Sequence, residues 1–290
     1  MAPAAGARRR VLFRLATSDR FDRAVRRWPA LRARATASAR RYVAGEEAGD
    51  ALAVARRLAE AGMAASIDLF GQRLTGGGGA VAAVVRDYEA LAARVAAEAP
   101  AETWLSVDLS HVAFDDAALE RIAAAVPEGA RLQVGAEELA VTGRVQAAVR
   151  RAAARGLPVE ATLQANLRRS AGDAEALAAA GVPVRLVKGA YVETGADALP
   201  WGPPADAAYV GLAHRLTAAG ADVALATHDG ALLDRLLPDF PQARVEHLLG
   251  IHPARVAALA AAGRSVRIYV PYGPDWLRYF MRLRAEAQQG

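Results

Sequence analysis

The chain contains no cysteine and a single lysine, and aromatic residues make up only 6% of its 290 positions. Without cysteine there is no disulfide framework, no thiolate metal cluster and no cysteine nucleophile. The sequence also has no uninterrupted apolar run long enough to span a bilayer, and residues 1–10 lack the apolar region of a signal peptide. We therefore expect a soluble, cytoplasmic protein.

Hydrophobic residues are abundant, at 53%, and 25 glycines and 14 prolines punctuate the chain. This composition is too apolar for a disordered protein and suffices for one large α/β core. Lys188 is the only lysine among 36 basic residues, so the other 35 are arginine. Such a bias is typical of a GC-rich genome, and the one retained lysine therefore asks for a structural reason.

Positive charge is concentrated at the N-terminus. Residues 1–41 hold twelve arginines and two acids, a net +10, and since the whole chain carries +5, residues 42–290 carry −5. A basic segment suits nucleic acid or an anionic membrane surface, although a solvated arginine-rich helix is the commoner explanation and the one we favour. Of the two binding alternatives we keep peripheral contact with a membrane and expect no nucleic-acid partner.

Short β-like runs alternate with alanine-rich helical stretches. The runs are Ala64–Asp68, Trp104–Leu109, Arg131–Val134, Val159–Gln164, Val184–Lys188, Val223–Thr227, Arg244–Leu248 and Val266–Val270. The helical stretches are Val81–Ala99, Asp116–Ala125, Val141–Arg155, Asp173–Ala180, Ala205–Ala219, Gly230–Leu237 and Pro253–Ala262. Eight such units over about 230 residues predict a (β/α)8 barrel of the α/β class.

We predict two units, an arginine-rich helical segment at residues 1–60 and the barrel at residues 61–290. A doubly wound open sheet is the alternative, but it normally carries a glycine-rich turn after its first strand. The tract Gly76–Gly79 has no G-x-G-x-x-G spacing, so we interpret it as a flexible loop.

The chemistry of a (β/α)8 barrel lies at the carboxyl ends of its strands. The polar residues at those ends are Asp68, Asp108, His111, Gln133, Gln164, Arg185, Lys188, Thr227, His228, Asp229, Glu246, His247 and Tyr269. They include no nucleophile next to a base and no standard spacing of metal ligands. We predict no metal site.

The segment Arg185–Glu193 places two cations and a tyrosine after a buried strand, without an adjacent acid to neutralise them. Buried positive charge needs an anionic partner, which the diphosphate of a flavin cofactor would supply. An arginine beside a flavin ring would also stabilise the reduced ring. A surface pair at the rim of a barrel explains the pattern equally well.

The same segment resembles the signature of the proline dehydrogenase family. The other segments that resemble this family are Ile268–Arg282, Leu163–Ser170, Ala226–Asp229 and, more weakly, Ser66–Gly71. The resemblance extends over residues 60–287, with the motifs in order. It implies a distorted (β/α)8 barrel that holds FAD, oxidises L-proline to Δ1-pyrroline-5-carboxylate by hydride transfer to flavin N5, and passes electrons to a quinone or another acceptor.

The resemblance also implies roles for individual residues. The cofactor positions are Arg185 near flavin N5, Gln164 facing the isoalloxazine, and Lys188, Gly189, Ala190, Thr227 and His228 along the cofactor. The substrate positions are Tyr191, Tyr269 and Tyr279 as pocket walls and Arg282 as the first of two adjacent arginines for the proline carboxylate.

This chain departs from the family in the substrate pocket. Asp108 stands where the family has a lysine, Gln133 matches its strand-three aspartate, Leu283 replaces the second arginine, and Asn166 replaces an aromatic residue. Losing one partner of a buried charge pair typically costs about 2–5 kcal/mol, so we expect weaker capture of a free carboxylate. Asp108 would then contact the amine or accept its proton.

Three hypotheses follow from these residues. The chain oxidises proline, or it oxidises a proline-derived or other cyclic or secondary amine on the same scaffold. Otherwise it is a non-catalytic barrel that binds a partner through its basic N-terminus.

Overall fold

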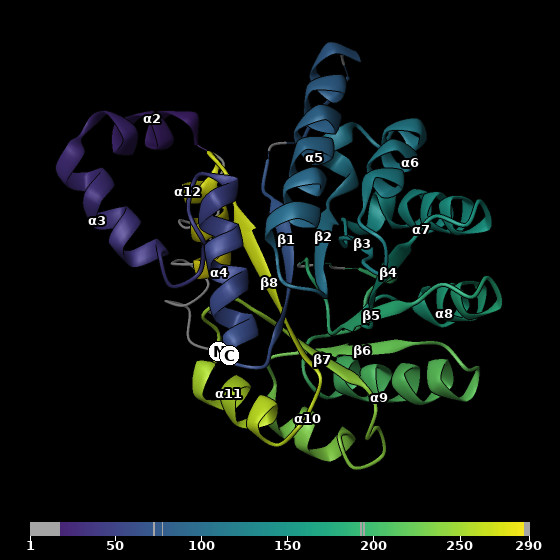
Figure 1. Ribbon diagram of the computed structural model, residues 1–290. Helices are drawn as coiled ribbons and strands as arrows, with labels where there is room; N and C mark the ends of the chain where they lie inside the picture. Colours follow the sequence, from purple (N-terminus) through teal and green to yellow (C-terminus); the bar gives the residue numbers. More distant parts are fainter. Residues whose placement is uncertain (1–17, 72, 77, 192, 194, 287–290) are drawn as a thin grey trace.

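A computed structural model describes residues 18–71, 73–76, 78–191, 193 and 195–286. Eight parallel strands close into a barrel in sequence order, with β8 paired to β1. The strands are β1 (Ala64–Leu69), β2 (Thr103–Val107), β3 (Leu132–Val134), β4 (Val159–Gln164), β5 (Val184–Val187), β6 (Val223–Ala226), β7 (Arg244–Leu248) and β8 (Val266–Tyr272). The predicted (β/α)8 fold is confirmed (Figure 1).

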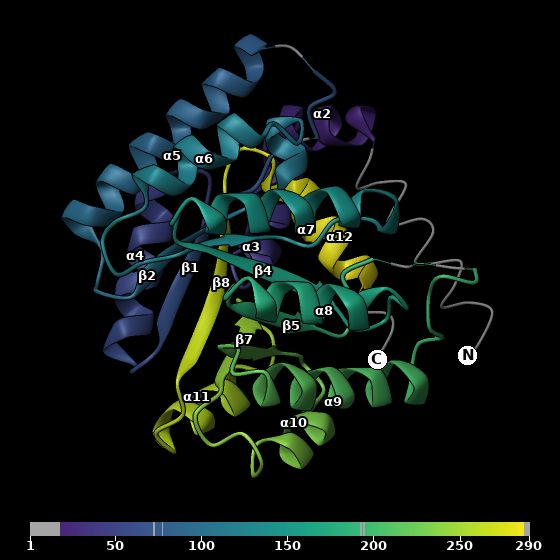
Figure 2. The ribbon, with the colours of Figure 1, turned by 90° about the vertical axis from the view of Figure 1, so that its right-hand side faces the viewer.

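Helices cover the outside of the barrel, and in Figure 2 α7, α8 and α9 run side by side. They are α4 (Ala48–Glu60), α5 (Gly78–Glu98), α6 (Asp116–Ala125), α7 (Leu139–Ala154), α8 (Ser170–Ala179), α9 (Pro203–Ala218), α10 (Gly230–Leu236), α11 (Pro253–Ala261) and α12 (Trp276–Glu286), with the 3₁₀ turn η1 (Leu109–Val112). The interpretation of Gly76–Gly79 as a loop was wrong in part, because Gly78 and Gly79 begin α5.

Side chains alternate between the two faces of each strand. Outward-facing residues such as Ile67, Leu105 and Leu132 are fully buried under the helices and form the main hydrophobic core. Ser106 on β2 and Gln133 on β3 are paired in register and alternate with these core residues, and Gln133 reaches across the barrel interior. Barrel interiors are usually filled by branched apolar side chains, so a polar interior is a departure that calls for internal pairing.

Trp104 closes the barrel at the amino ends of the strands. The guanidinium carbons of Arg267, Arg244 and Arg131 lie 3.4, 4.7 and 5.1 Å from the centre of its ring. Cations over an indole face are attracted by the ring quadrupole. This cluster fills the amino end of the barrel, and we call the opposite, carboxyl end its mouth.

The N-terminal helices α2 (Asp19–Arg27) and α3 (Pro29–Ala39) lie to one side of the barrel, next to α12 (Figure 1). Val25 and Ala39 from these helices share a second hydrophobic cluster with Phe280 and Leu283 of α12. α4 instead packs on β1 and β8. The boundary predicted at residue 60 stays a prediction, and residues 1–17 lie outside the described part of the chain.

Among the residues that the structure describes, no helix has the length and apolar character needed to cross a membrane.

Candidate active site at the barrel mouth

Asp68 and Tyr269 join the first and last strands at the mouth of the barrel. The Tyr269 hydroxyl donates to Asp68 Oδ2 at 2.7 Å, and Asp68 is fully buried. Tyr88 of α5 donates to the Ser106 carbonyl at 2.9 Å and lies 3.4 Å from Asp68 Oδ1. Burial, and next the charge of Asp68, raise the pKa of Tyr269 well above its ordinary value. Sequence reasoning placed Asp68 at a strand end but gave it no role.

Asp108 and Glu137 bring two carboxylates to the ends of β2 and β3. Glu137 is only 2% exposed, and its Oε1 accepts the Ser110 backbone N–H at 2.8 Å. Its Oε2 lies 3.5 Å from the Arg73 guanidinium. Burial, followed by the charge of Asp108, raises the pKa of Glu137. Sequence reasoning missed Glu137, although two consecutive acids that begin three residues after a buried strand are a signal that could have found it.

Gln133 lies deeper in the barrel, one layer below Asp108. Its Nε2 donates to Glu160 at 2.5 Å and to Glu246 at 3.0 Å. These bonds commit its amide nitrogen to the interior, and the structure places Gly135 next to Asp108 instead. The role of Gln133 in a substrate pocket stays a prediction.

Arg185 is paired with an acid, which corrects the expectation from the sequence. Its Nε lies 2.8 Å from Glu246 Oε2 on β7, and its guanidinium carbon lies 5.8 Å from the centre of the Tyr269 ring. Burial alone would raise the pKa of Glu246, but Arg185 and Arg244 outweigh it and lower that pKa. The absence of an acid near Arg185 in the sequence was misleading because the barrel closes β5 and β7 onto a shared interior.

Lys188 is also neutralised, contrary to the same expectation. Its Nζ lies 2.6 Å from Asp206 of α9 and 3.1 Å from Asp229, and 5.4 Å from the centre of the Trp201 ring. Asp229 caps α10 by accepting the Leu232 N–H at 3.1 Å. Burial lowers the pKa of Lys188, but the bonds to the two carboxylates outweigh it, so that pKa is raised. The lysine therefore links the N-terminal ends of α9 and α10 to the end of β5.

The segment after β5 is held to β4 by Gln164. Its Nε2 donates to the Glu137 carbonyl at 2.8 Å, and its Oε1 accepts the Ala190 N–H at 2.9 Å. A β-carbon on Gly189 would lie 2.5 Å from Asn166 Oδ1, so only glycine fits there without displacing Asn166. Tyr191 follows in the same loop and is half-buried.

Thr227 and His228 follow β6. Thr227 Oγ1 accepts the Asp229 N–H at 3.2 Å, which shapes the turn into α10. His228 Nδ1 lies 3.0 Å from His247 Nδ1. Burial and the neighbouring ring lower the pKa of His228 to about 3, and burial followed by nearby cationic groups lowers the pKa of His247 to about 4. The pair is therefore uncharged at neutral pH.

Helix α12 carries the last three predicted substrate residues, of which Tyr279 lies beside Tyr269. The Tyr279 ring is buried, edge-on to Phe70 at 5.1 Å and 6.3 Å from the Tyr269 ring. Leu283 is 6% exposed and belongs to the hydrophobic cluster between α12 and the N-terminal helices. The side chain of Arg282 lies outside the described part of the structure.

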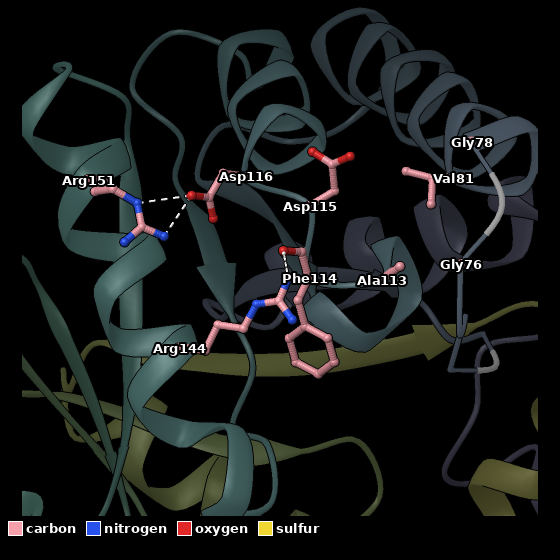
Figure 3. Close-up of a pocket in the computed structure, with 9 residues that line it drawn as sticks. All are labelled: Gly76, Gly78, Val81, Ala113, Phe114, Asp115, Asp116, Arg144 and Arg151. Carbon is pink, nitrogen blue, oxygen red and sulfur yellow. Dashed lines mark hydrogen bonds and ion pairs between the residues drawn. The ribbon is translucent and has the colours of Figure 1, made fainter.

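A separate open pocket of about 460 Å³ lies outside the strands, among α5, α6 and α7 (Figure 3). Gly76 and Gly78 line one side. On the other side, Arg151 pairs with Asp116 at 2.6 Å and Arg144 donates to the Phe114 carbonyl at 2.9 Å. Because these cations are already engaged, the pocket does not offer the uncompensated charge that would attract a phosphate.

The polar groups collected at the mouth define the candidate site, and comparisons with known proteins bear on its chemistry. A family model described as proline dehydrogenase matches residues 51–287. Proline dehydrogenase 1 of Bacillus subtilis (strain 168) is 30% identical over 262 residues, which cover 86% of each chain. The proline dehydrogenase of Deinococcus radiodurans is 36% identical over 139 residues, or 44% of each chain.

Solved structures of proline utilization A (PutA) share the fold. The Bdellovibrio bacteriovorus protein, described as inactivated by N-propargylglycine, superposes with a TM-score of 0.84 at 18% identity and covers 96% of this chain. A Bradyrhizobium japonicum PutA superposes with a TM-score of 0.72 at 20% identity and covers 93% of this chain. The chain spans 36% and 33% of those two longer proteins.

Proposed function

The chain belongs to the proline dehydrogenase family and is an oxidoreductase of the CH–NH group of proline, and we propose that it uses FAD as the hydride acceptor. The product is then Δ1-pyrroline-5-carboxylate. The match of the family model to residues 51–287 carries this conclusion, since it covers the whole barrel and α12.

The polar groups at the mouth fit a flavin ring. Arg185, the second residue of β5, places its guanidinium beside the Tyr269 ring. Asn166 Oδ1 is buried and has no hydrogen-bond partner among the described residues, so it could accept a hydrogen bond from a bound cofactor. A bound FAD would supply the hydride acceptor, held by Gln164, Arg185, Gly189, Ala190, Thr227 and His228.

Lys188 fits the diphosphate less well than the sequence suggests. Two carboxylates already balance its charge. An ammonium has three N–H donors, so one remains for a cofactor oxygen. We therefore propose that Lys188 contributes at most one hydrogen bond to the cofactor.

Different residues of the chain then bind and orient the substrate. Tyr191, Tyr269 and Tyr279 wall the ring of the amine, and Arg282 binds its carboxylate. Holding the reacting carbon in one orientation is mainly a positioning effect. Arg185 would stabilise the negative charge that the hydride acceptor gains when the amine is oxidised. Asp108 faces the amine and accepts a proton from it.

Anaerobic mixing with L-proline tests this proposal. We expect a yellow protein whose flavin absorbance bleaches on mixing. Bleaching by other cyclic amines or proline esters but not by proline would favour the altered substrate. A colourless protein that does not take up added FAD would favour the non-catalytic barrel.

We further propose that the reduced cofactor passes its electrons to a quinone or another acceptor. We also propose that the turn between α2 and α3 contacts an anionic membrane surface. Trp28 and Leu31 at this turn are 63% and 50% exposed. Exposed arginines flank them, including Arg27 and Arg34. An aromatic and an aliphatic side chain among cations suit a lipid surface with acidic headgroups.

Co-sedimentation with vesicles rich in acidic phospholipid tests the membrane contact. The substitution pair Trp28→Ser and Leu31→Ser should reduce binding, and the pair Arg27→Gln and Arg34→Gln should weaken its salt dependence. Deleting residues 1–41 is a poorer test, because Val25 and Ala39 pack against α12. Vesicle binding that survives both pairs of substitutions would exclude this surface.

A further inference from the structure

Asp108 and Gly135 are neighbours at the carboxyl ends of β2 and β3. β2 and β3 pair Ser106 with Gln133 and Val107 with Val134, and one further step along both strands leads to Asp108 and Gly135. The Gly135 N–H donates to the Val107 carbonyl at 2.9 Å. Because side chains alternate along a strand, the positions two residues beyond Ser106 and Gln133 face the interior as these do. Any side chain at position 135 would enter the space beside Asp108.

The Asp108 carboxylate already fills that space. A β-carbon on Gly135 would overlap Asp108 Oδ1 and lie 3.1 Å from its Cγ, whereas its distance to the Val107 carbonyl, 3.6 Å, is an ordinary contact. Gly135 is not among the described glycines with positive φ. Its backbone therefore does not require glycine, and the steric demand comes from Asp108 alone.

Asp108 also lies within electrostatic reach of the mouth. Its charge contributes to the raised pKa of Glu137, after burial as the larger cause. It also contributes to the raised pKa of Tyr269, after burial, Asp68 and Tyr279. Tyr269 belongs to the proposed wall of the substrate site, so a cation bound against this wall lies within the same field.

We propose that Asp108 binds the ammonium group of the substrate and that Gly135 is a specificity-determining residue because it leaves room for that carboxylate. The inference rests on the proposed function, since it takes an amino acid or amine to enter the mouth. An N–H donated by a cation to a carboxylate is among the stronger hydrogen bonds, and it is available to any cyclic amine. The site then recognises the nitrogen of its substrate through β2 and β3.

Four variants of the holoenzyme test this inference: Asp108→Asn, Asp108→Ala, Gly135→Ala and the double substitution D108A/G135A. The two readouts are the KM for L-proline and the rise in melting temperature given by L-proline or by oxolane-2-carboxylate. The second ligand has a ring oxygen in place of the amine, so it lacks the N–H. The melting readout needs no turnover.

We expect D108N and G135A each to raise the KM for proline about tenfold or more, since a hydrogen bond to a charged group contributes about 1.5–3 kcal/mol. Stabilisation by oxolane-2-carboxylate should stay as in the wild type. In the D108A background, G135A should change neither readout, because there is no carboxylate left to displace. Gly172→Ala is the matched control, since a β-carbon there meets nothing within 4 Å.

The inference is overturned if D108N leaves the KM unchanged, or if G135A weakens proline binding as strongly in the D108A background. Equal weakening of both ligands would also overturn it, because that pattern indicates a general loss of the pocket. If proline raises the melting temperature of the wild type but does not reduce its flavin, the proposed function is refuted. The melting temperatures of the variants would then still decide the inference. Failure of proline to bind at all would refute both.

Discussion

The Tyr269 hydroxyl donates to the buried carboxylate of Asp68 at 2.7 Å, across the seam where β8 meets β1. The bond fixes the ring that faces Arg185 at 5.8 Å and Tyr279 at 6.3 Å. A wall residue of the proposed substrate site is thus positioned by the strand pairing that closes the barrel.

Removing this acceptor should weaken both folding and substrate binding. Asp68→Ala leaves the partly buried Tyr269 hydroxyl without the acceptor that the structure describes, whereas Tyr88 keeps the Ser106 carbonyl. An unsatisfied buried donor costs about 1–3 kcal/mol, and we expect a loss of that size in the free energy of unfolding measured by urea denaturation. Asp68→Asn retains an acceptor oxygen and should lose less. Equal stability of D68A and the wild type would contradict this account.

The His228–His247 pair predicts a loss of stability in mild acid. Their pKa values in the folded protein, about 3 and about 4, lie below the ordinary value of 6.5. Protons therefore bind the unfolded chain more readily, so the stabilising contribution is present above pH 6.5 and is lost as the pH falls toward 4 and then 3.

The double substitution H228Q/H247Q should lose less melting temperature than the wild type between about pH 7 and about pH 5. Glutamine keeps a polar group at each position but does not titrate. His214→Gln is the control, because the His214 side chain is 51% exposed. A pH dependence that the double substitution leaves unchanged would assign the acid sensitivity to other groups.

The interior ion pairs should matter far more than those on the surface. Glu246→Ala removes the carboxylate that faces both Arg185 at 2.8 Å and Arg244 at 2.7 Å. Breaking a buried pair typically costs about 3–5 kcal/mol, because the remaining charge loses its partner in a medium of low dielectric. The matched control is Glu175→Ala, which breaks a pair with Arg215 whose side chains are 66% and 52% exposed. Similar losses of unfolding free energy in E246A and E175A would rule out a structural role for the interior network.

The barrel itself was predictable because its signals are local. Apolar runs and alanine-rich helical stretches follow one another along the chain, and β4 and β7 have the predicted bounds. The strand ends could also be expected to meet at one face, because the carboxyl ends of all strands in a barrel do so.

The charge balance of the site was not predictable in the same way. The acid that faces Arg185 lies on β7, and one acid that faces Lys188 lies 41 residues further along the chain. Such partners become neighbours only when the barrel closes. The importance of Gly135 likewise depends on the register of β2 and β3, which no local pattern reveals.

Lys188 provides the last prediction, since one lysine survives in a chain whose other basic residues are all arginine. Its ammonium lies between Asp206 and Asp229, and a guanidinium fork is larger and planar, so it does not fit the same pair of contacts. Lys188→Met should bring two uncompensated carboxylates together and lower the melting temperature of the protein even without FAD. Lys188→Arg should rescue it only in part.

The pH dependence of this effect has a definite sign. The pKa of Lys188 is raised above its ordinary value of 10.5, so the stabilisation is present at neutral pH and is lost as the pH rises through the raised pKa. K188M should therefore differ most from the wild type near neutrality, and adding D206N should recover part of the loss by removing one of the opposed charges. If K188M instead melts like the wild type without FAD and only fails to retain the cofactor, then the lysine is kept for the phosphates and not for the two helices it joins.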